Sequence, residues 1–153
     1  MEYRFKEIRE NFDFKQHEIA KDIGISRGNY ANIESETENI KLRTFNTYCN
    51  KFNFSMDYVA NLSDKFSYSG ITKLEKLEKR IISDRLITIE NDLNKKGKDI
   101  AKELGIAPST YSDYKNVNKP NLIQTLMVKR LASKHDYSMD WIVGRSEQKF
   151  IKK

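Results

Sequence analysis

One pattern of residues occurs twice in this chain, and the repeat constrains the fold more than any other feature. The segment HEIAKDIGI at 17–25 reappears as KDIAKELGI at 98–106, and FSMDYV at 54–59 reappears as YSMDWI at 137–142. The offsets are 81 and 83 residues, so the second copy carries two additional residues between the matched segments. A pattern that returns in the same order predicts two similarly folded units in one chain.

Both units are expected to be helical. The chain has only two prolines and six glycines in 153 residues, and it lacks runs of alternating β-branched residues. Apolar residues recur instead at helical spacing, as with Ile19, Ala20 and Ile23 before Gly24. The sequence therefore predicts an all-α fold of two units, each built from about five short helices.

The boundaries of the units follow from the repeat. We expect the first unit at residues 1–68, a linker at 69–81 and the second unit at 82–153. The segment ITKLEKLEKRI at 71–81 contains helix formers without a break. The linker is therefore expected to be helical and to continue into the first helix of the second unit, which would make the connection stiff.

Charge is unevenly distributed along the chain. There are 28 Lys and Arg against 22 Asp and Glu, which gives a formal charge of +6. Residues 1–68 have a net charge of −1, and residues 69–153 have a net charge of +7. Because clustered Lys and Arg attract polyanions, the second half favours a partner that is either a nucleic acid or an acidic protein.

Several classes of protein are not expected. The apolar runs are too short to cross a bilayer and the N-terminus lacks an apolar signal segment, so we expect a cytoplasmic protein without membrane contact. One cysteine and two histidines exclude an internal disulfide and disfavour a metal site. The chain has neither a glycine-rich phosphate loop nor a Ser/His/Asp order, so no catalytic site and no cofactor are expected.

Residues 15–34 have the pattern of two short helices joined by a tight turn. Gly24 suits the left-handed residue that ends a helix, and Ser26 suits the N-cap of the next one. Tyr30 then points inward. The opposite face carries a polar row of Arg27, Gly28, Asn29 and Asn32. A helix-turn-helix of this kind can place its second helix in the major groove of DNA.

The motifs IRE at 8–10, QHEIA at 16–20, GISR at 24–27, IE at 33–34 and SMDYV at 55–59 follow one another in a recognisable order. In this order and spacing they resemble the Cro and lambda-repressor-like helix-turn-helix family, also called the Xre family. The resemblance covers residues 4–64, and more loosely residues 82–148. It implies a five-helix domain that binds DNA.

The resemblance also implies a role for each residue of the motif. Gln16 would hold a phosphate at the start of the second helix, and exposed residues of the next helix would read bases. The candidate DNA contacts of the first unit are Gln16, Ser26, Arg27, Gly28, Asn29 and Asn32. Arginine can donate two hydrogen bonds to guanine and asparagine can pair with adenine, so the chemistry of Arg27 and Asn32 agrees with this role. Gly28 has no side chain with which to read a base.

The second unit departs from the family pattern at three positions. Gly97 stands where the phosphate-holding glutamine is expected, Asp113 is equivalent to Asn32, and Lys115 replaces the usual glutamate. The candidate DNA contacts of this unit are Lys98, Ser109, Thr110, Asp113, Lys115 and Lys119. Asp113 could accept a hydrogen bond from cytosine or could repel DNA. The second unit is therefore either a weaker DNA reader or a surface for a protein partner.

Two functional hypotheses follow. The first is a sequence-specific transcriptional regulator, a repressor of phage or mobile-element type, that binds a double-stranded DNA operator. It would act as a pseudo-dimer on an asymmetric operator, or as a homodimer on a palindrome. The alternative is a helix-turn-helix-derived inhibitor or anti-defence factor, such as an anti-CRISPR or anti-repressor protein. That protein would grip a protein partner with its basic second half and could also regulate its own promoter.

Overall fold

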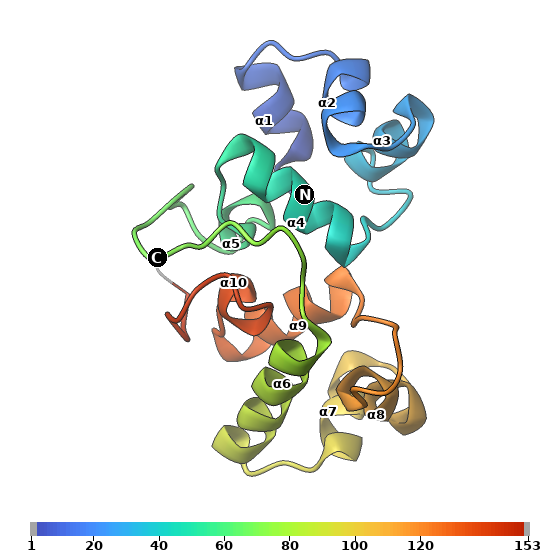
Figure 1. The fold of residues 1–153 in the computed structure, drawn as a ribbon, viewed down its shortest axis with the longest axis vertical. Helices are drawn as coiled ribbons and strands as arrows, with labels where there is room; N and C mark the ends of the chain where they lie inside the picture. The colour runs from blue at the N-terminus through green and yellow to red at the C-terminus, as the bar shows by residue number, and fades with distance from the viewer. Residues whose placement is uncertain (1–2, 152–153) are drawn as a thin grey trace.

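The computed structural model describes residues 3–151, which form ten α-helices and no β-strand (Figure 1). The helices are α1 (Phe5–Asn11), α2 (Gln16–Ile23), α3 (Arg27–Glu34), α4 (Leu42–Phe52), α5 (Met56–Val59), α6 (Lys79–Leu93), α7 (Gly97–Leu104), α8 (Pro108–Lys115), α9 (Thr125–His135) and α10 (Met139–Ile142). This arrangement confirms the all-α prediction. Residues 1–2 and 152–153 of the expected units lie outside the described residues.

The helices α1 to α5 surround a core rich in aromatic side chains. Phe5 and Tyr48 lie edge to face with their ring centroids 5.0 Å apart, and Phe45 lies 6.0 Å from Phe5. All three side chains are buried. Rings in this geometry attract each other beyond their burial, so these contacts fix α1 against α4.

The helices α6 to α10 follow in the same order around a more aliphatic core, which includes Leu86, Ile89, Ile100 and Leu131. The helix α6 has 15 residues where its counterpart α1 has 7. The helices α4 and α9 both have 11 residues. The repeat in the sequence thus corresponds to a repeat of helices in space.

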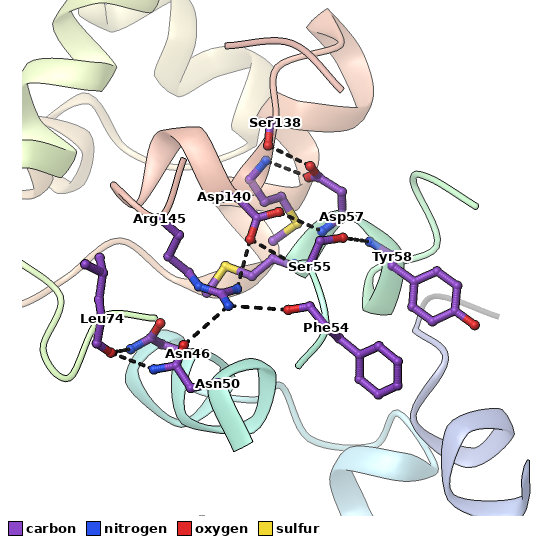
Figure 2. A network of polar contacts seen from close by, with 12 residues as sticks. Asn46, Asn50, Phe54, Ser55, Asp57, Tyr58, Leu74, Ser138, Asp140 and Arg145 are labelled. Carbon is purple, nitrogen blue, oxygen red and sulfur yellow. Dashed lines mark hydrogen bonds and ion pairs between the residues drawn. The ribbon is translucent and has the colours of Figure 1, made fainter. Parts of the chain in front are cut away.

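The segment between the two sets of helices is not helical up to Lys79, so the prediction of a helical linker is wrong for residues 69–78. The side-chain amides of Asn46 and Asn50 both donate to the carbonyl oxygen of Leu74, at 2.9 and 2.6 Å (Figure 2). The backbone N–H of Thr72 donates to the carbonyl oxygen of Arg145 at 2.7 Å. These contacts with distant parts of the chain replace the hydrogen bonds of a local helix, so tertiary contacts override helix propensity here.

The two short helices α5 and α10 meet in the middle of the molecule and cap each other (Figures 1 and 2). The carboxylate of Asp57 accepts from the Ser138 hydroxyl at 2.6 Å and from the Met139 N–H at 2.7 Å. In return, the carboxylate of Asp140 accepts from the Met56 N–H at 3.0 Å. Because Asp57 and Asp140 are equivalent positions of the repeat, the junction has approximate two-fold symmetry.

A buried arginine completes this junction on one side. Arg145, 1% exposed, donates to the Asp140 carboxylate at 2.9 Å. Its other terminal nitrogen donates to the side-chain oxygen of Asn50 and to the carbonyl oxygen of Phe54, both at 3.3 Å (Figure 2). One side chain from the C-terminal part of the chain therefore ties α10 to α4 and to the segment before α5.

Candidate nucleic-acid interface

The turn between α2 and α3 has the geometry that the sequence predicts. Gly24 ends α2 in the left-handed conformation, with φ of 77°. Ser26 is the N-cap of α3, and its hydroxyl oxygen accepts from the Asn29 N–H at 3.1 Å. The N–H of Ile25 donates to the carbonyl oxygen of Ala20 at 3.0 Å, which closes the turn against α2. Both helix-end predictions, Gly24 and Ser26, are confirmed.

The polar row of α3 faces solvent in the first unit. Arg27, Gly28 and Asn32 are exposed, and Asn29 is half-buried. Ser26 is also exposed, although its hydroxyl oxygen serves the helix as a cap. The inward face of α3 carries Tyr30 and Ile33, which are buried. Side chains that could reach base edges therefore project from one face of a helix whose other face is anchored in the core.

An ion pair fixes the position of α3 relative to α1. Arg9 binds Glu34 through two nitrogens, each 2.8 Å from a carboxylate oxygen. Burial alone would raise the pKa of Glu34, but the hydrogen bonds and charge of Arg9 hold that pKa below its ordinary value, with a further contribution from Gln16. Gln16, predicted to hold a phosphate, is half-buried beside this pair at the start of α2.

The same pair involves one of three acidic residues, Glu34, Glu36 and Glu38, whose carboxylates would repel a nearby phosphate backbone. Glu34 is neutralised by Arg9, and its side chain is 5% exposed. A carboxylate oxygen of Glu36 accepts from the Tyr3 N–H at 3.0 Å. Two of the three acids in the run are thus held by partners of the same unit, which reduces their repulsion of a nearby phosphate backbone.

In the second unit the equivalent ion pair has reversed charges. Lys115, equivalent to Glu34, binds Glu90, equivalent to Arg9, with 2.8 Å between Nζ and Oε2. A Cβ atom on Gly97 would lie 2.9 Å from Lys115 Nζ and 3.2 Å from the ring of Tyr111. A side chain at position 97 would therefore require the Lys115 ammonium group and the Tyr111 ring to shift, which glycine avoids.

The other predicted contacts of the second unit lie on or beside α7 and α8. Lys98 and Ser109 are exposed, and Thr110 is half-buried. Lys119 lies 3.2 Å from the carboxylate of Asp113, so that charge is partly neutralised within the unit. Lys115 is turned toward Glu90 and is half-buried. Of these six residues, Lys98, Ser109 and Lys119 are exposed, and Lys119 is paired with a carboxylate of its own unit.

The helices α3 and α8 lie along one long edge of the molecule, near its two ends (Figure 1). The N-terminal ends of α4 and α9 lie between them on the same edge (Figure 1). Lys41 and Arg43, at the start of α4, are exposed there. This edge therefore carries α3, α8 and two further basic side chains at the start of α4.

Sequence reasoning missed the residues that join the units. Asp57, Ser138, Asp140 and Arg145 form the junction, and none of them was a candidate for a functional role. A signal was present, because the triplet Ser-Met-Asp occurs unchanged at 55–57 and 138–140. An aspartate retained beside buried apolar residues in both copies indicates a buried polar contact.

The described residues give little support to other kinds of site. No helix within residues 3–151 is long and apolar enough to cross a membrane. Among the same residues, no group of three or more His, Cys, Asp or Glu side chains could hold a metal ion.

The geometry above is that of a helix-turn-helix, a class of domain that binds DNA. Comparison with known proteins agrees for the first unit: residues 3–65 match the family described as helix-turn-helix domain. No curated protein and no solved structure gives a significant match to the chain. A helix-turn-helix domain is therefore present at the N-terminus, and it suggests a DNA-binding regulator.

Proposed function

We propose that the chain is a sequence-specific transcriptional regulator in which two helix-turn-helix units of the Cro and lambda-repressor-like kind bind one DNA operator as a single-chain pseudo-dimer. Its action is repression, of the phage or mobile-element type that the sequence resembles, and it needs neither a cofactor nor catalysis. In this proposal α3 reads one half-site through Arg27 and Asn32, while the second unit contacts the other half-site through Lys98 of α7 and Ser109 of α8.

The main support for the proposal is that α3 and α8 lie on one edge of the molecule (Figure 1). The two units are joined by hydrogen bonds in which Asp57 and Asp140 each cap the short helix of the other unit. In helix-turn-helix dimers, two recognition helices meet successive major grooves about 34 Å apart, which is one turn of DNA. Here the second recognition helix comes from the same chain, so one chain supplies both. Because α8 differs from α3 at each position that could read a base, the operator is asymmetric and no homodimer is required.

The test is binding of the full chain to duplex from its own upstream region and to a scrambled duplex, over a series of salt concentrations. We expect selective binding of one chain per duplex and a steep salt dependence, because lysines and arginines displace counterions from phosphates. Arg27→Ala should weaken specific binding by about 1 to 3 kcal/mol and leave binding to scrambled DNA nearly unchanged. Lys51→Ala, which removes an exposed charge at the other end of α4, serves as the matched control.

A footprint of two adjacent half-sites, together with repression of a reporter under that operator, would support the whole proposal. Lys98→Ala should then weaken binding to both DNAs equally and reduce the salt slope by about one. Equal loss on both duplexes with Arg27→Ala would reject base reading by α3.

One observation favours a second candidate, a protein-binding inhibitor or anti-defence factor that uses the second unit. Lys115 and Lys119 face carboxylates of their own unit, and Asp113 stands where the first unit has Asn32. If the footprint covers one half-site and Lys98→Ala has no effect on either duplex, the second unit is a surface for a protein partner. The first unit could then still regulate the promoter of the gene.

A further inference from the structure

The first unit exposes aromatic side chains around a hollow of about 270 Å³ at the C-terminal ends of α1 and α4. Phe12 and Phe66 line it and are 58% and 60% exposed. The ring of Phe54 contacts both of theirs, with centroid distances of 6.2 and 6.4 Å. Tyr58 and Phe52 also line this site, which we refer to as the aromatic hollow. Exposed apolar rings gathered around a hollow indicate a docking surface.

The equivalent positions of the second unit are not aromatic. Leu93, which is half-buried, corresponds to Phe12, and Lys149 corresponds to Phe66. Lys149 pairs with Asp92, with 2.5 Å between Nζ and a carboxylate oxygen. The second unit exposes the ring of Phe150 instead, which is 51% exposed and stacks on its neighbour Tyr137 with centroids 5.3 Å apart. One unit therefore carries a hollow and the other carries a projecting ring.

Both features face away from the proposed DNA interface. Residues 60–70 and the segment that follows α10 lie on the long edge opposite α3 and α8 (Figure 1). The two segments lie on either side of the junction between α5 and α10, which has approximate two-fold symmetry (Figure 1). A second copy of the chain, related by a two-fold axis through that junction, would place its second unit against the first unit of this copy. The hollow of each copy would then face the Phe150 ring of the other.

Charge favours this pairing of unlike units. Residues 1–68 have a net charge of −1 and residues 69–153 a net charge of +7. Contact between a first and a second unit brings opposite charges together, whereas contact between two second units would bring two strongly positive surfaces together. A two-fold interface also requires a surface that complements itself. This edge meets that requirement, because it carries both an aromatic hollow and a ring that can enter one.

We propose that the chain forms a two-fold dimer in which the aromatic hollow of each copy binds the Phe150 ring of the other. Two ring contacts bury less surface than a standard interface of about 1,600 Å², so the dissociation constant lies at about 1 to 100 μM. Dimerisation does not rest on the proposed DNA-binding function. Its consequence does: each copy keeps α3 and α8 on an outer edge, so one dimer holds two duplexes.

Sedimentation of the full chain at concentrations from about 1 to 500 μM tests the dimer. We expect Phe66→Ser and Phe150→Ser each to weaken dimerisation at least about tenfold, because buried aromatic rings contribute most at interfaces. Ile87→Ser is the matched control, since Ile87 is 44% exposed on α6 and does not line the hollow. A chain that stays monomeric throughout, or an equal loss in Ile87→Ser, would overturn the proposal.

Mixing the two variants distinguishes a ring in a hollow from contact between like surfaces. A mixed dimer retains one complete contact, between the unchanged hollow of the Phe150→Ser copy and the unchanged ring of the Phe66→Ser copy. Dimers of either variant alone retain none. We therefore expect the mixture, with one variant fluorescently labelled, to associate at least about threefold more tightly than either variant alone. No gain on mixing would reject the assignment of Phe150 to the hollow.

Adding duplex from the upstream region separates this proposal from the DNA-binding function. Above the dissociation constant of the dimer we expect a complex of two chains and two duplexes. Phe150→Ser should reduce it to one chain and one duplex without changing the affinity for DNA. If the chain dimerises but binds no duplex, the proposed function fails and the dimer stands. If one chain binds one duplex at every concentration, the dimer fails and the proposed function stands.

Discussion

The two units hold their third helices in place with ion pairs of opposite polarity. In the first unit an arginine of α1, Arg9, binds Glu34 of α3 beside Gln16. In the second unit Glu90 of α6 binds Lys115 of α8, and Gly97 stands where a glutamine would collide with Lys115. The charges are complementary within each unit, and the glycine leaves space beside the ammonium group of Lys115.

This difference changes how the second unit should be interpreted. Taken alone, the loss of the glutamine and the change of glutamate to lysine suggest a unit that has lost its DNA contacts. In the structure Lys115 of α8 binds Glu90 of α6, and Gly97 of α7 leaves space beside Lys115 and Tyr111, so both changes concern packing within the second unit. Only residues that point outward, such as Ser109 and Asp113, carry information about what the second unit binds.

The junction shows a second difference between equivalent positions. Asp140 has Arg145 as a buried cationic partner, whereas the equivalent of Arg145 in the first unit is Leu62. Asp57 relies instead on the Ser138 hydroxyl and the Met139 N–H. Arg145 thus pairs with Asp140 and not with Asp57, and because losing one partner of a buried ion pair is strongly destabilising, this arginine is the most sensitive point of the junction.

The largest expected effect is therefore that of Arg145→Ala. Removing the cation leaves the Asp140 carboxylate buried without its counter-charge, and we expect a loss of about 3 to 5 kcal/mol in the free energy of unfolding. Urea denaturation measures this loss, with Arg80→Ala as the control for removal of an exposed arginine. A loss below about 1 kcal/mol would mean that the carboxylates do not depend on Arg145.

The second effect tests the reversed ion pairs. Glu34→Lys places two cations together in a partly buried site, and we expect it to lower the free energy of unfolding by about 3 kcal/mol. The triple variant Arg9→Glu, Glu34→Lys, Gln16→Gly copies the second unit and should recover at least half of that loss. Glu38→Lys, the same charge change at an exposed site, is the control. Additive losses in the triple variant would show that the three positions are not coupled.

The third effect is a dependence of stability on pH that arises at the junction. Burial and the nearby Asp140 raise the pKa of Asp57 to about 8, against the opposing hydrogen bonds of Ser138 and Met139. In the unfolded chain an aspartate has a pKa near 4, so the folded chain holds this proton more tightly. The resulting stabilisation is complete below about pH 4 and is lost as the pH rises toward about 8.

We expect the free energy of unfolding to fall by about 2 kcal/mol from about pH 5.5 to about pH 7.5. Glu103 does not interfere, because the hydrogen bond from Lys95 lowers the pKa of Glu103 to about 2, and its contribution changes only in more acidic solution. Burial also raises the pKa of the adjacent Asp140, although the charge of Arg145 opposes that shift. Asp57→Asn should therefore reduce the slope of the profile measured by urea denaturation at each pH. A profile that keeps its slope in Asp57→Asn would place the titrating group elsewhere.

Local features of the sequence were enough to predict much of the fold and of the first unit's site. The left-handed Gly24, the cap at Ser26 and the buried Tyr30 depend on neighbours within one or two turns, so their patterns are visible in the sequence. The linker and the junction depend on partners far apart in sequence, such as Asn46 with Leu74 and Asp57 with Ser138. The repeated Ser-Met-Asp triplet marks the buried aspartates but does not identify their distant partners, and the helix formers at 71–78 point to the wrong structure.

The smallest effect concerns the caps of α3 and α8. Ser26 caps α3 with its hydroxyl oxygen, whereas its equivalent, Ala107, offers no acceptor and α8 begins instead with Pro108. Both cap residues have extended backbone angles, with φ and ψ of −72° and 155° for Ser26 and −67° and 145° for Ala107. Ser26→Ala should therefore lower the free energy of unfolding by about 1 kcal/mol, and Ala107→Ser should raise it by about 0.5 to 1 kcal/mol. Thermal and urea denaturation measure the free energy of unfolding of both variants. If Ala107→Ser does not raise it, Pro108 already stabilises the start of α8 as much as a capping hydroxyl would, and the two turns are stabilised by different means.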